Sequence, residues 1–284
     1  METIVIIGVP VFDGGVYIKR ALESIRSQTL KNFTVIISDN ASTDDTGKIC
    51  QSLSEVDGRF VYKKQDVNIG ALGNFQSLLT YANAEYFVFL AADDYWEPTF
   101  LERNISRLEI EKSSIASISR VDFRKDDEFI LNSNGDYEIS GTITERLQKY
   151  FSFCSDNSRF YAVYRRAVIQ EALRDPPNCH AADWYISALT LMKGEHLCVD
   201  EILMHREIAE ADRYSRSVKA DNSKYLIGEY FPVLPLTFAI FHRLPFAVFL
   251  KILGSMLRLN RDKHVEYVIF KHGASFYTRL LARL

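Results

Sequence analysis

Two adjacent carboxylates stand where an apolar, strand-like run ends and a helix-like run is about to begin. They are Asp93 and Asp94, within the segment FLAADDYW at residues 89–96. In an open α/β sheet the ligand crevice lies beyond the carboxyl ends of the strands, so side chains at a strand end can reach a bound molecule. Paired carboxylates attract a hard cation such as Mn2+ or Mg2+, which in turn binds phosphate oxygens. The structural alternative is that one of them caps the helix expected to begin near Pro98.

Polar or turn-forming residues also follow the first two strand-like runs. The first loop holds Pro10 and Phe12, whose aromatic ring offers a surface for a nucleotide base. At the end of the second strand stands Asp39, whose carboxylate can accept hydrogen bonds from a base or a ribose. Ser42 and Asp45 have the spacing of a capping box for the next helix. We therefore assign Asp39 to ligand binding and Ser42 to structure.

The loop after the third strand, NIGALGN at residues 68–74, places two glycines before a helix. Such glycines allow a ligand to approach the backbone closely, so Gly70 and Asn74 are candidate ligand contacts. Taken alone, a loop of this kind is more often a helix entry than a binding site. It does not match the P-loop pattern, and no G-x-G-x-x-G follows the first strand, which disfavours a dinucleotide cofactor.

Alternating strands and helices are expected to position these loops. Strand-like runs rich in β-branched and aromatic residues lie at residues 4–8, 33–39, 60–64 and 86–90. Apolar residues at helical spacing lie between them, as in Phe75, Leu78 and Leu79. This order predicts an α/β fold with a mostly parallel sheet flanked by helices on both faces.

The composition is that of a globular protein with a substantial core, since 47% of the 284 residues are hydrophobic and 25% are charged. The four cysteines show no C-x-x-C spacing and no secretory leader precedes the first strand, so we expect free thiols in a reducing cytosol. The six histidines form no H-x-x-x-H or H-E-x-x-H pattern, which disfavours a zinc site.

Charge is distributed unevenly along the chain. Residues 231–284 contain eight Lys or Arg and two acidic residues, a net charge of +6, which leaves −9 for the rest. An acidic body disfavours nucleic acid as a partner. The basic, apolar tail is expected either to meet an anionic membrane surface or to pack against the acidic body.

The order of these segments resembles the nucleotide-sugar-binding half of the family 2 glycosyltransferases, which have the glycosyltransferase type A fold. The likeness covers about the first 110 residues and rests on IVIIGVPVFDGG, TVIISDNASTDDT, NIGALGNF and EYFVFLAADDYW. It implies a nucleotide diphosphate sugar donor whose base and ribose bind Asp39. It also implies that Asp93 and Asp94 lie near the ribose, the diphosphate and a Mn2+ or Mg2+ ion.

One position departs from the family pattern. Many members have an acid where this chain has Ala91. Either Asp93 and Asp94 suffice or metal binding is weakened; we favour the first, because one carboxylate, two diphosphate oxygens and waters complete an octahedral shell. A cation on the diphosphate stabilises the leaving group without a proton donor. The remaining requirement is a base that deprotonates the acceptor hydroxyl during an inverting attack.

The best candidate for that base is Asp183, in the segment CHAADWY at residues 179–185. This segment is similar to the acid–tryptophan segment that supplies the base in the family. An acid beside aromatic residues is partly desolvated, which raises its pKa toward a useful range. The structural alternative is a helix-capping aspartate beside a core tryptophan. His180, Asp156 and Asp175 are weaker candidates for the base.

A basic segment follows further along the chain. His205, Arg206 and the stretch RYSR at residues 213–216 occupy the place where related enzymes have a mobile loop that closes over the diphosphate. By this resemblance we expect Arg206 to contact the nucleotide sugar.

Three units are expected: a nucleotide-sugar-binding part at residues 1–115, an acceptor and catalytic part at 116–205, and a helical extension at 206–284. The apolar stretches at 230–241 and 246–257 are shorter than the roughly 20 residues of a spanning helix. They are expected to pack in a core, to form a homodimer, or to lie in the membrane interface. We favour the interface, and hence a cytoplasmic protein peripheral to the membrane, because a lipid-linked acceptor would be presented there.

The sequence thus predicts a metal-dependent inverting glycosyltransferase that acts on a carbohydrate or lipid-linked acceptor in cell-surface polysaccharide synthesis. One alternative is a nucleotidyltransferase that forms a nucleotide sugar. It should carry a glycine-rich, arginine-containing signature after the first strand, which PVFDGGVYIKR does not match. The other alternative is a protein that binds nucleotide sugars without catalysis, as the absent acid at Ala91 and the apolar tail suggest.

Overall fold

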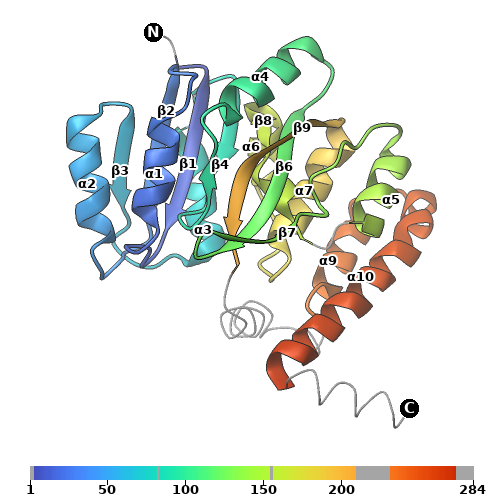
Figure 1. Cartoon of the computed structure of the whole chain (residues 1–284). Coiled ribbons are helices and arrows are strands. Elements are labelled where there is room, and N and C mark those ends of the chain that lie inside the picture. Colours follow the sequence, from blue (N-terminus) through green and yellow to red (C-terminus); the bar gives the residue numbers. More distant parts are fainter. Residues whose placement is uncertain (1–2, 82, 154–155, 209–230, 273–284) are drawn as a thin grey trace.

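One mixed sheet runs through the described part of the chain, with helices on both of its faces (Figure 1). The computed structural model describes residues 3–81, 83–153, 156–208 and 231–272. Within these ranges the sheet has nine strands in the order β3-β2-β1-β4-β8-β6-β9-β5, and β7 pairs with β6 at its side. The α/β class, with helices flanking the sheet and a helical C-terminal part, is confirmed.

The elements alternate regularly in the first half of the chain and less regularly in the second. The strands are β1 Val5–Val11, β2 Phe33–Asp39, β3 Phe60–Lys64, β4 Tyr86–Phe89, β5 Tyr95–Trp96, β6 Ala116–Lys125, β7 Glu128–Asn132, β8 Val163–Arg165 and β9 His196–Glu207. The helices are α1 Ile18–Arg26, α2 Thr46–Val56, α3 Gly70–Leu78, α4 Phe100–Ile110, α5 Ile143–Phe153, α6 Arg166–Ala172, α7 Ala182–Lys193, α9 Leu234–Phe241 and α10 Phe246–His272, with 3-10 turns η1 Leu79–Tyr81 and η2 Ser158–Tyr161.

The N-terminal half of the sheet is parallel. β1 lies between β2 and β4, and β3 lies outside β2. Val11 pairs with Asp39 and Asp39 with Lys64, so the loops after these three strands leave the sheet at one edge. β4 ends at Phe89, beside Gly8, which directs the carboxylate segment to the same edge. This is the edge at which parallel sheets bind ligands.

The second half of the sheet is mixed. β7 and β8 run antiparallel to β6, whereas β9 runs parallel to it. The far end of β9 also pairs antiparallel with the short β5, where Tyr95 lies opposite His205. β9 therefore returns the chain to the carboxylate segment. The sheet is continuous, and β9 passes the expected boundary at residue 205. The division into three units stays a prediction.

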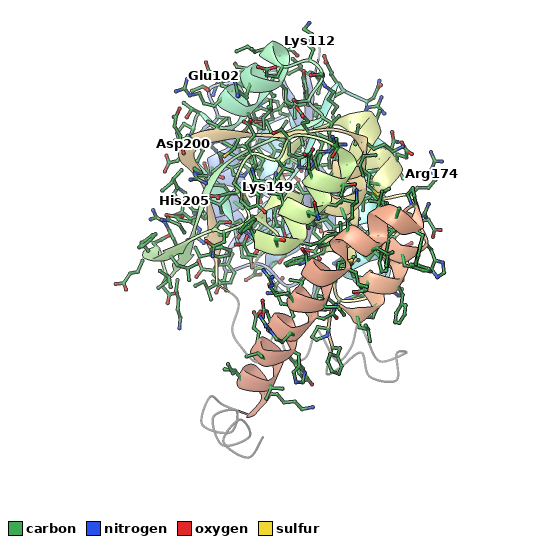
Figure 2. All side chains as sticks on the ribbon, turned by 90° about the vertical axis from the view of Figure 1, so that its right-hand side faces the viewer. Glu102, Lys112, Lys149, Arg174, Asp200 and His205 are labelled. Atoms are coloured by element: carbon green, nitrogen blue, oxygen red, sulfur yellow. The ribbon has the colours of Figure 1, made fainter. Side chains whose placement is uncertain are left out.

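The C-terminal helices share a core of their own with α5 and α7. Leu236, Ile240, Ile252 and Met256 are fully buried in this cluster, together with Trp184 of α7. Figure 2 shows α10 beside α5 and projecting past the sheet. One face of the extension is thus packed against the body. No helix in the described ranges is long and apolar enough to cross a membrane.

Candidate active site

The carboxylate segment lies directly after β4, and its two acids have different environments. Asp94 is 2% exposed, whereas Asp93 is half-buried. The Asp94 carboxylate accepts hydrogen bonds from the backbone N–H of Glu207 at 3.0 Å and from Nε of Arg206 at 3.3 Å. Neither acid caps a helix, because β5 intervenes and α4 begins after Thr99. The capping alternative is therefore excluded for both carboxylates.

The electrostatics of this segment favour an added cation. The pKa of Asp94 is raised to about 7, chiefly by burial and also by the neighbouring Asp93, while Arg206 opposes the rise. The positive charge of Arg206 therefore does not fully offset the charges of Asp93 and Asp94 in this desolvated environment. In the described part of the chain no three His, Cys, Asp or Glu side chains gather as a metal site. The donor set suits a cation held by Asp93 and by oxygens of a bound diphosphate.

Arg206 joins the carboxylate segment to the segment of Ser158, and its contact to the donor stays a prediction. Its guanidinium is 5.2 Å from the ring centroid of Phe123 and 4.8 Å from that of Tyr161. Nη1 also donates to the hydroxyl of Ser158 at 3.2 Å. Burial lowers the pKa of Arg206, but Asp94 and other anionic neighbours outweigh it and hold the pKa above its ordinary value. The side chain is therefore a fixed, permanent positive charge.

Asp183 lies in the first turn of α7 and reaches the same region. Its carboxylate accepts a hydrogen bond from Nδ2 of Asn157 at 2.9 Å. Burial raises the pKa of Asp183, while Asn157, His180 and, more weakly, Arg206 lower it, so the charge of Arg206 is felt at this carboxylate. The residue at the N-cap is Ala181, so Asp183 does not cap the helix. Its geometry fits a base held beside the donor site.

The weaker candidates for the base have other surroundings. Asp156 accepts hydrogen bonds from the backbone N–H groups of Asn134 and Ser158, which ties two loops together. Burial raises the pKa of Asp156, but the hydrogen bonds from Ser158 and the charge of Arg206 outweigh burial and bring the pKa below its ordinary value. Asp175 is exposed at the surface. A carboxylate with a lowered pKa is a poor proton acceptor, which favours Asp183.

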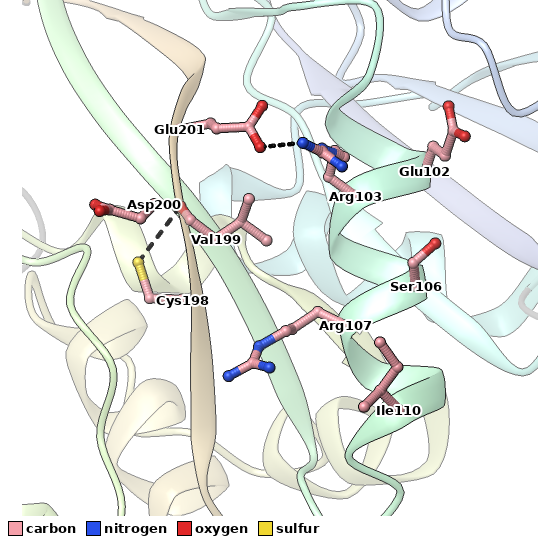
Figure 3. Close-up of a pocket in the computed structure, with 9 residues that line it drawn as sticks. All are labelled: Glu102, Arg103, Ser106, Arg107, Ile110, Cys198, Val199, Asp200 and Glu201. Carbon is pink, nitrogen blue, oxygen red and sulfur yellow. Dashed lines mark hydrogen bonds and ion pairs between the residues drawn. The ribbon is translucent and has the colours of Figure 1, made fainter.

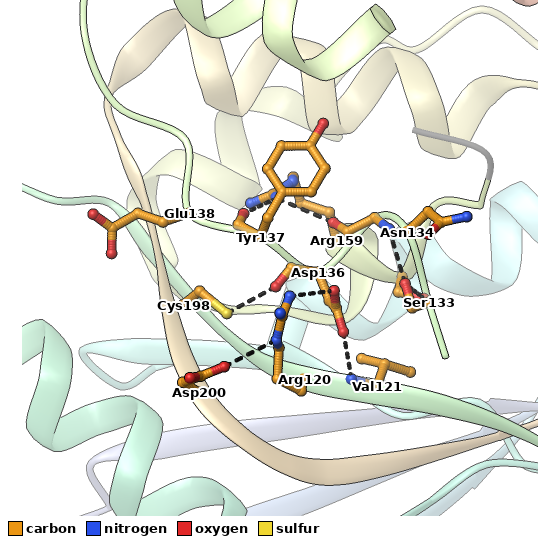
Figure 4. Close-up of polar contacts among 12 residues, drawn as sticks. Arg120, Val121, Ser133, Asn134, Asp136, Tyr137, Glu138, Arg159, Cys198 and Asp200 are labelled. Carbon is orange, nitrogen blue, oxygen red and sulfur yellow. Dashed lines mark hydrogen bonds and ion pairs between the residues drawn. The ribbon is translucent and has the colours of Figure 1, made fainter. Parts of the chain in front are cut away.

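A buried arginine anchors the segment that holds both Asp183 and Arg206. Asn157 and Ser158 are followed by Arg159, which is 0% exposed. Its Nη2 donates to the carbonyl oxygen of Gly135 at 3.0 Å and to that of Tyr137 (Figure 4). These contacts of Arg159 fix the backbone of the segment in which Asn157 donates to Asp183 and Ser158 accepts from Arg206.

Asp39 lies at the end of β2, but its carboxylate is fully buried. One oxygen accepts from the backbone N–H of Ser42 at 2.8 Å, and the other accepts from the hydroxyl of Tyr62 at 2.6 Å. A nucleotide base can therefore reach this carboxylate only after groups that cover it, such as Tyr62, move. The predicted ligand role of Asp39 stays a prediction.

The predicted capping box of the following helix is wrong. α2 begins at Thr46 after Asp45, whose side chain makes no capping hydrogen bond, and it is Asp44 that accepts from the backbone N–H of Thr46 at 3.0 Å. The chain turns at Ala41, which has a φ of 64°. The Ser42 hydroxyl then faces the neighbouring loop and accepts a hydrogen bond from the backbone N–H of Asp13 at 2.9 Å. Ser42 is structural, as expected, but it joins two loops instead of capping a helix.

Of the remaining predicted donor contacts, Phe12 and Gly70 are open to a ligand, whereas Pro10 is part of a strand and Asn74 is buried. Phe12 is 49% exposed in the loop after β1, where it is open to a ligand, whereas Pro10 belongs to β1 itself. Gly70 opens α3 with a φ of 79° and has open space where a side chain would be. Asn74 is buried. Its Nδ2 donates a hydrogen bond to the carbonyl oxygen of Ser38, and its Oδ1 accepts one from the Ser38 hydroxyl. Asn74 therefore joins α3 to β2.

Several side chains of the site escaped the sequence patterns. Arg20 of α1 contacts the carboxylate segment, Tyr62 covers Asp39, and Asn157 holds Asp183. His205 is also buried, between the carboxylates of Asp122 and Glu97. Arg20, Tyr62 and Asn157 lie in no motif, because their partners are distant in sequence, whereas His205 lies in the basic segment noted from the sequence. The predicted stretch at residues 213–216 lies outside the described residues.

A separate hollow of about 350 Å³ lies between α4 and β9 (Figure 3). Arg103 and Glu201 form an ion pair at its edge, with 2.5 Å between the charged atoms. It is lined by Glu102, Arg103, Ser106, Arg107, Ile110, Cys198, Val199, Asp200 and Glu201. None of the predicted site residues lines it, so this hollow is distinct from the site at the strand ends.

Two known glycosyltransferases each match about a third of the chain. Over 91 residues the chain is 40% identical to UDP-Glc:alpha-D-GlcNAc-diphosphoundecaprenol beta-1,3-glucosyltransferase WfaP of Escherichia coli. This match covers 32% of this chain and 36% of that protein. Over 87 residues the chain is 37% identical to GalNAc(5)-diNAcBac-PP-undecaprenol beta-1,3-glucosyltransferase of Campylobacter jejuni. This match covers 30% of this chain and 28% of that protein. The matches span well under two-thirds of either relative.

Solved structures show the same fold over most of the chain. The S. aureus TarS fragment 1–349 in complex with UDP superposes with a TM-score of 0.59 at 15% identity, covering 95% of this chain and 92% of that one. The mannosyltransferase PcManGT from Pyrobaculum calidifontis, in complex with GDP-Man and Mn2+, gives a TM-score of 0.59 at 17% identity and covers 100% and 79%. Glycosyl transferase family 2 matches residues 6–173. Since this match spans more than half of a chain with the same fold, the protein belongs to glycosyl transferase family 2.

Proposed function

We propose that the protein transfers a sugar from a nucleotide diphosphate donor to a carbohydrate or lipid-linked acceptor, with inversion at the anomeric carbon. One observation carries the proposal: Arg206 donates to Asp94 of the carboxylate segment and to the hydroxyl of Ser158, and the adjacent Asn157 donates to Asp183. The donor end and the base therefore share one site at the carboxyl edge of the sheet. Two relatives whose names specify undecaprenol-linked acceptors, and a similar fold solved with UDP, support this substrate class.

The donor is held between the first three loops and the carboxylate segment. Phe12 provides an exposed ring for the base, and the glycine loop at the start of α3 leaves room for the backbone to approach the ligand. Asp93 would hold a Mn2+ or Mg2+ ion against the diphosphate, with Asp94 behind it. When bound, the ion stabilises the negative charge of the leaving group. Arg206 adds a permanent positive charge beside the same phosphates.

The acceptor reacts on the side of Asp183. The Asp183 carboxylate takes the proton of the acceptor hydroxyl as that oxygen bonds to the anomeric carbon, and the bond to the nucleotide diphosphate breaks. Asn157 holds the carboxylate in place, because its own amide oxygen accepts a hydrogen bond from the Tyr150 hydroxyl at 2.8 Å. Burial raises the pKa of Asp183, which makes its carboxylate a stronger base than that of an exposed aspartate.

We also propose that α10 brings the protein to the cytosolic face of the membrane. Its outer face exposes Phe246, Leu250 and Leu257, with side chains 64%, 52% and 55% exposed, beside the exposed Lys251 and Arg258. Apolar and basic residues on one helix face are typical of interfacial helices. A homodimer through this face is the alternative, and sedimentation with anionic vesicles against the oligomeric state in solution separates the two.

The test of the activity is a transfer assay with UDP, GDP and dTDP sugars and an undecaprenyl diphosphate glycan, in the presence of Mn2+. We expect one donor to give product with inverted configuration, as read by NMR of the anomeric proton. Release of pyrophosphate from a nucleoside triphosphate and a sugar phosphate would instead identify the nucleotidyltransferase alternative. Donor binding in calorimetry without turnover on any acceptor would identify the non-catalytic alternative.

A further inference from the structure

Arg20 of α1 contacts the carboxylate segment and two further segments, the β6–β7 turn and the end of β9. Its Nη2 donates to the backbone carbonyl of Asp93 and to the carboxylate of Glu207, both at 2.9 Å. Nη1 donates to the carboxylate of Asp127, in the turn between β6 and β7, at 2.5 Å. The guanidinium also lies 4.5 Å from the ring centroid of Tyr95. One side chain thus joins α1, the β4–β5 loop, the β6–β7 turn and the end of β9.

These contacts close a ring around the two acids of the segment. The Glu207 carboxylate, which is 8% exposed, receives Arg20 on one oxygen and the backbone N–H of Asp126 on the other at 3.0 Å. The backbone N–H of the same Glu207 donates to Asp94. Arg20 therefore holds the segment directly, through the carbonyl of Asp93, and indirectly, through Glu207 and Asp94.

We propose that Arg20 is a positioning residue for the donor site: it fixes the backbone of the carboxylate segment so that the Asp93 carboxylate faces the diphosphate and its cation. This inference deepens the proposed function and rests on it for the identity of the ligand. The planar guanidinium has a fork of donors that can bond several oxygens in fixed directions, which a lysine cannot do. Groups that orient a metal-binding segment in this way control metal affinity without touching the metal.

The attachment of α1 to the sheet does not depend on Arg20. The helix packs through Ile18, Ala21, Leu22 and Ile25, all of which are buried. The Arg20 side chain lies outside this apolar face and is 27% exposed. Its replacement is therefore expected to loosen the carboxylate segment while leaving the helix in place.

The decisive experiment compares Arg20→Met with Arg20→Lys and with a matched control, Arg26→Met. Arg26 is on the same helix, and its side chain is about half exposed in a surface pair with Glu23. The probe is whichever of UDP, GDP and dTDP binds the wild type most tightly, titrated by calorimetry over a range of Mn2+ concentrations. For Arg20→Met we expect the Mn2+ concentration at half-maximal binding to rise about tenfold. Saturating Mn2+ restores the wild-type affinity, Arg20→Lys is intermediate, and Arg26→Met matches the wild type.

A second measurement does not require any ligand. Hydrogen exchange followed by mass spectrometry should show faster exchange in Arg20→Met for peptides that cover residues 92–95 and 205–208. Peptides from α1 and β1 should keep the wild-type rate. Unchanged exchange at both segments, or faster exchange throughout the protein, would overturn the inference. If the wild type binds none of the three diphosphates, the proposed function fails, whereas the exchange comparison still decides the role of Arg20.

Discussion

The donor side and the acceptor side of the site are built in different ways. On the donor side, three consecutive parallel strands deliver their loops to one edge, so Phe12, Asp39 and Gly70 arrive there through local topology. On the acceptor side, Asp183 meets Asn157 across 26 positions, and Arg206 links the two sides, since it meets Asp94 from 112 positions away in the chain. The donor side is thus set by strand order, whereas the acceptor side depends on individual side-chain partners. Changes on the two sides should separate binding from chemistry.

The largest effect is expected for Asp183→Asn, on the acceptor side. The amide has nearly the same shape but cannot take a proton, so kcat should fall by about 10³-fold, within the range typical of general bases. Donor affinity, measured by calorimetry with Mn2+, should stay within a factor of two or so of the wild type, because Asp183 does not contact the diphosphate in our proposal. Single-turnover kinetics with saturating donor measures the loss.

The matched control for this comparison is Asp175→Asn, because Asp175 is exposed and lies on the same approach to α7. It should leave both kcat and donor affinity unchanged. Wild-type turnover in Asp183→Asn would remove Asp183 as the base and direct attention to His180. A loss of donor binding in that variant would show that the two sides of the site are not separable.

The next largest effect is expected for Asp93→Ala, on the donor side. Loss of the carboxylate should weaken Mn2+-dependent donor binding by about 10²-fold, at the upper end of what changes around metal sites produce. Chelation of the metal by EDTA should have a similar effect on the wild type and almost none on the variant. The measurement is calorimetric titration of the donor with and without Mn2+. Equal metal dependence in both proteins would contradict a ligand role for Asp93.

The pH dependence sharpens the assignment of the base. Only ionised Asp183 can accept a proton, and its pKa is raised, so kcat/KM should fall on acidification at a higher pH than an exposed aspartate would allow. The hydrogen bond from Asn157 stabilises the ionised form and lowers this pKa. Asn157→Ala should therefore move the acid limb of the profile to higher pH. An acid limb that persists unchanged in the residual activity of Asp183→Asn would assign it to another group.

The sequence predicts the strands and loops of the donor side well, whereas the ligand roles of their residues stay predictions, and it predicts the acceptor side only in part. Alternating β-branched runs and helical faces identify the parallel strands, and Asp39, Asp93 and Asp94 follow from their positions at strand ends. The family resemblance identifies Asp183 and Arg206. Their partners are not predictable in this way, because contacts such as those of Asn157 and Arg20 form only when distant segments pack together.

Even at a strand end, a pattern gives the position of a side chain without its neighbours. Asp39 stands where the topology places it, but nothing in the sequence shows that Tyr62 covers it. In the same way, the spacing of Ser42 and Asp45 fits a capping box, and the backbone turn at Ala41 directs Ser42 elsewhere. Local spacing specifies which contacts are possible, and the packed structure decides which of them form.

The smallest effect tests this point at Tyr62. The Tyr62 hydroxyl and a nucleotide base would compete for the same oxygen of Asp39. Tyr62→Phe should therefore strengthen nucleotide diphosphate binding by about fivefold, the equivalent of one hydrogen bond of about 1 kcal/mol. It should also lower the free energy of unfolding of the unliganded protein by about 1 kcal/mol or more, because the buried carboxylate loses a donor.

These two changes of opposite sign, measured by calorimetry and by urea unfolding, distinguish competition from simple damage to the site. Weaker binding in Tyr62→Phe would mean that the hydroxyl itself contacts the ligand. Asp39→Asn provides the comparison, since it removes the acceptor for both partners and should weaken nucleotide binding. If neither variant changes the affinity for the nucleotide diphosphate, Asp39 is a structural residue that closes the β2–α2 turn through Ser42. The nucleotide base is then held by other groups, with Phe12 first among them.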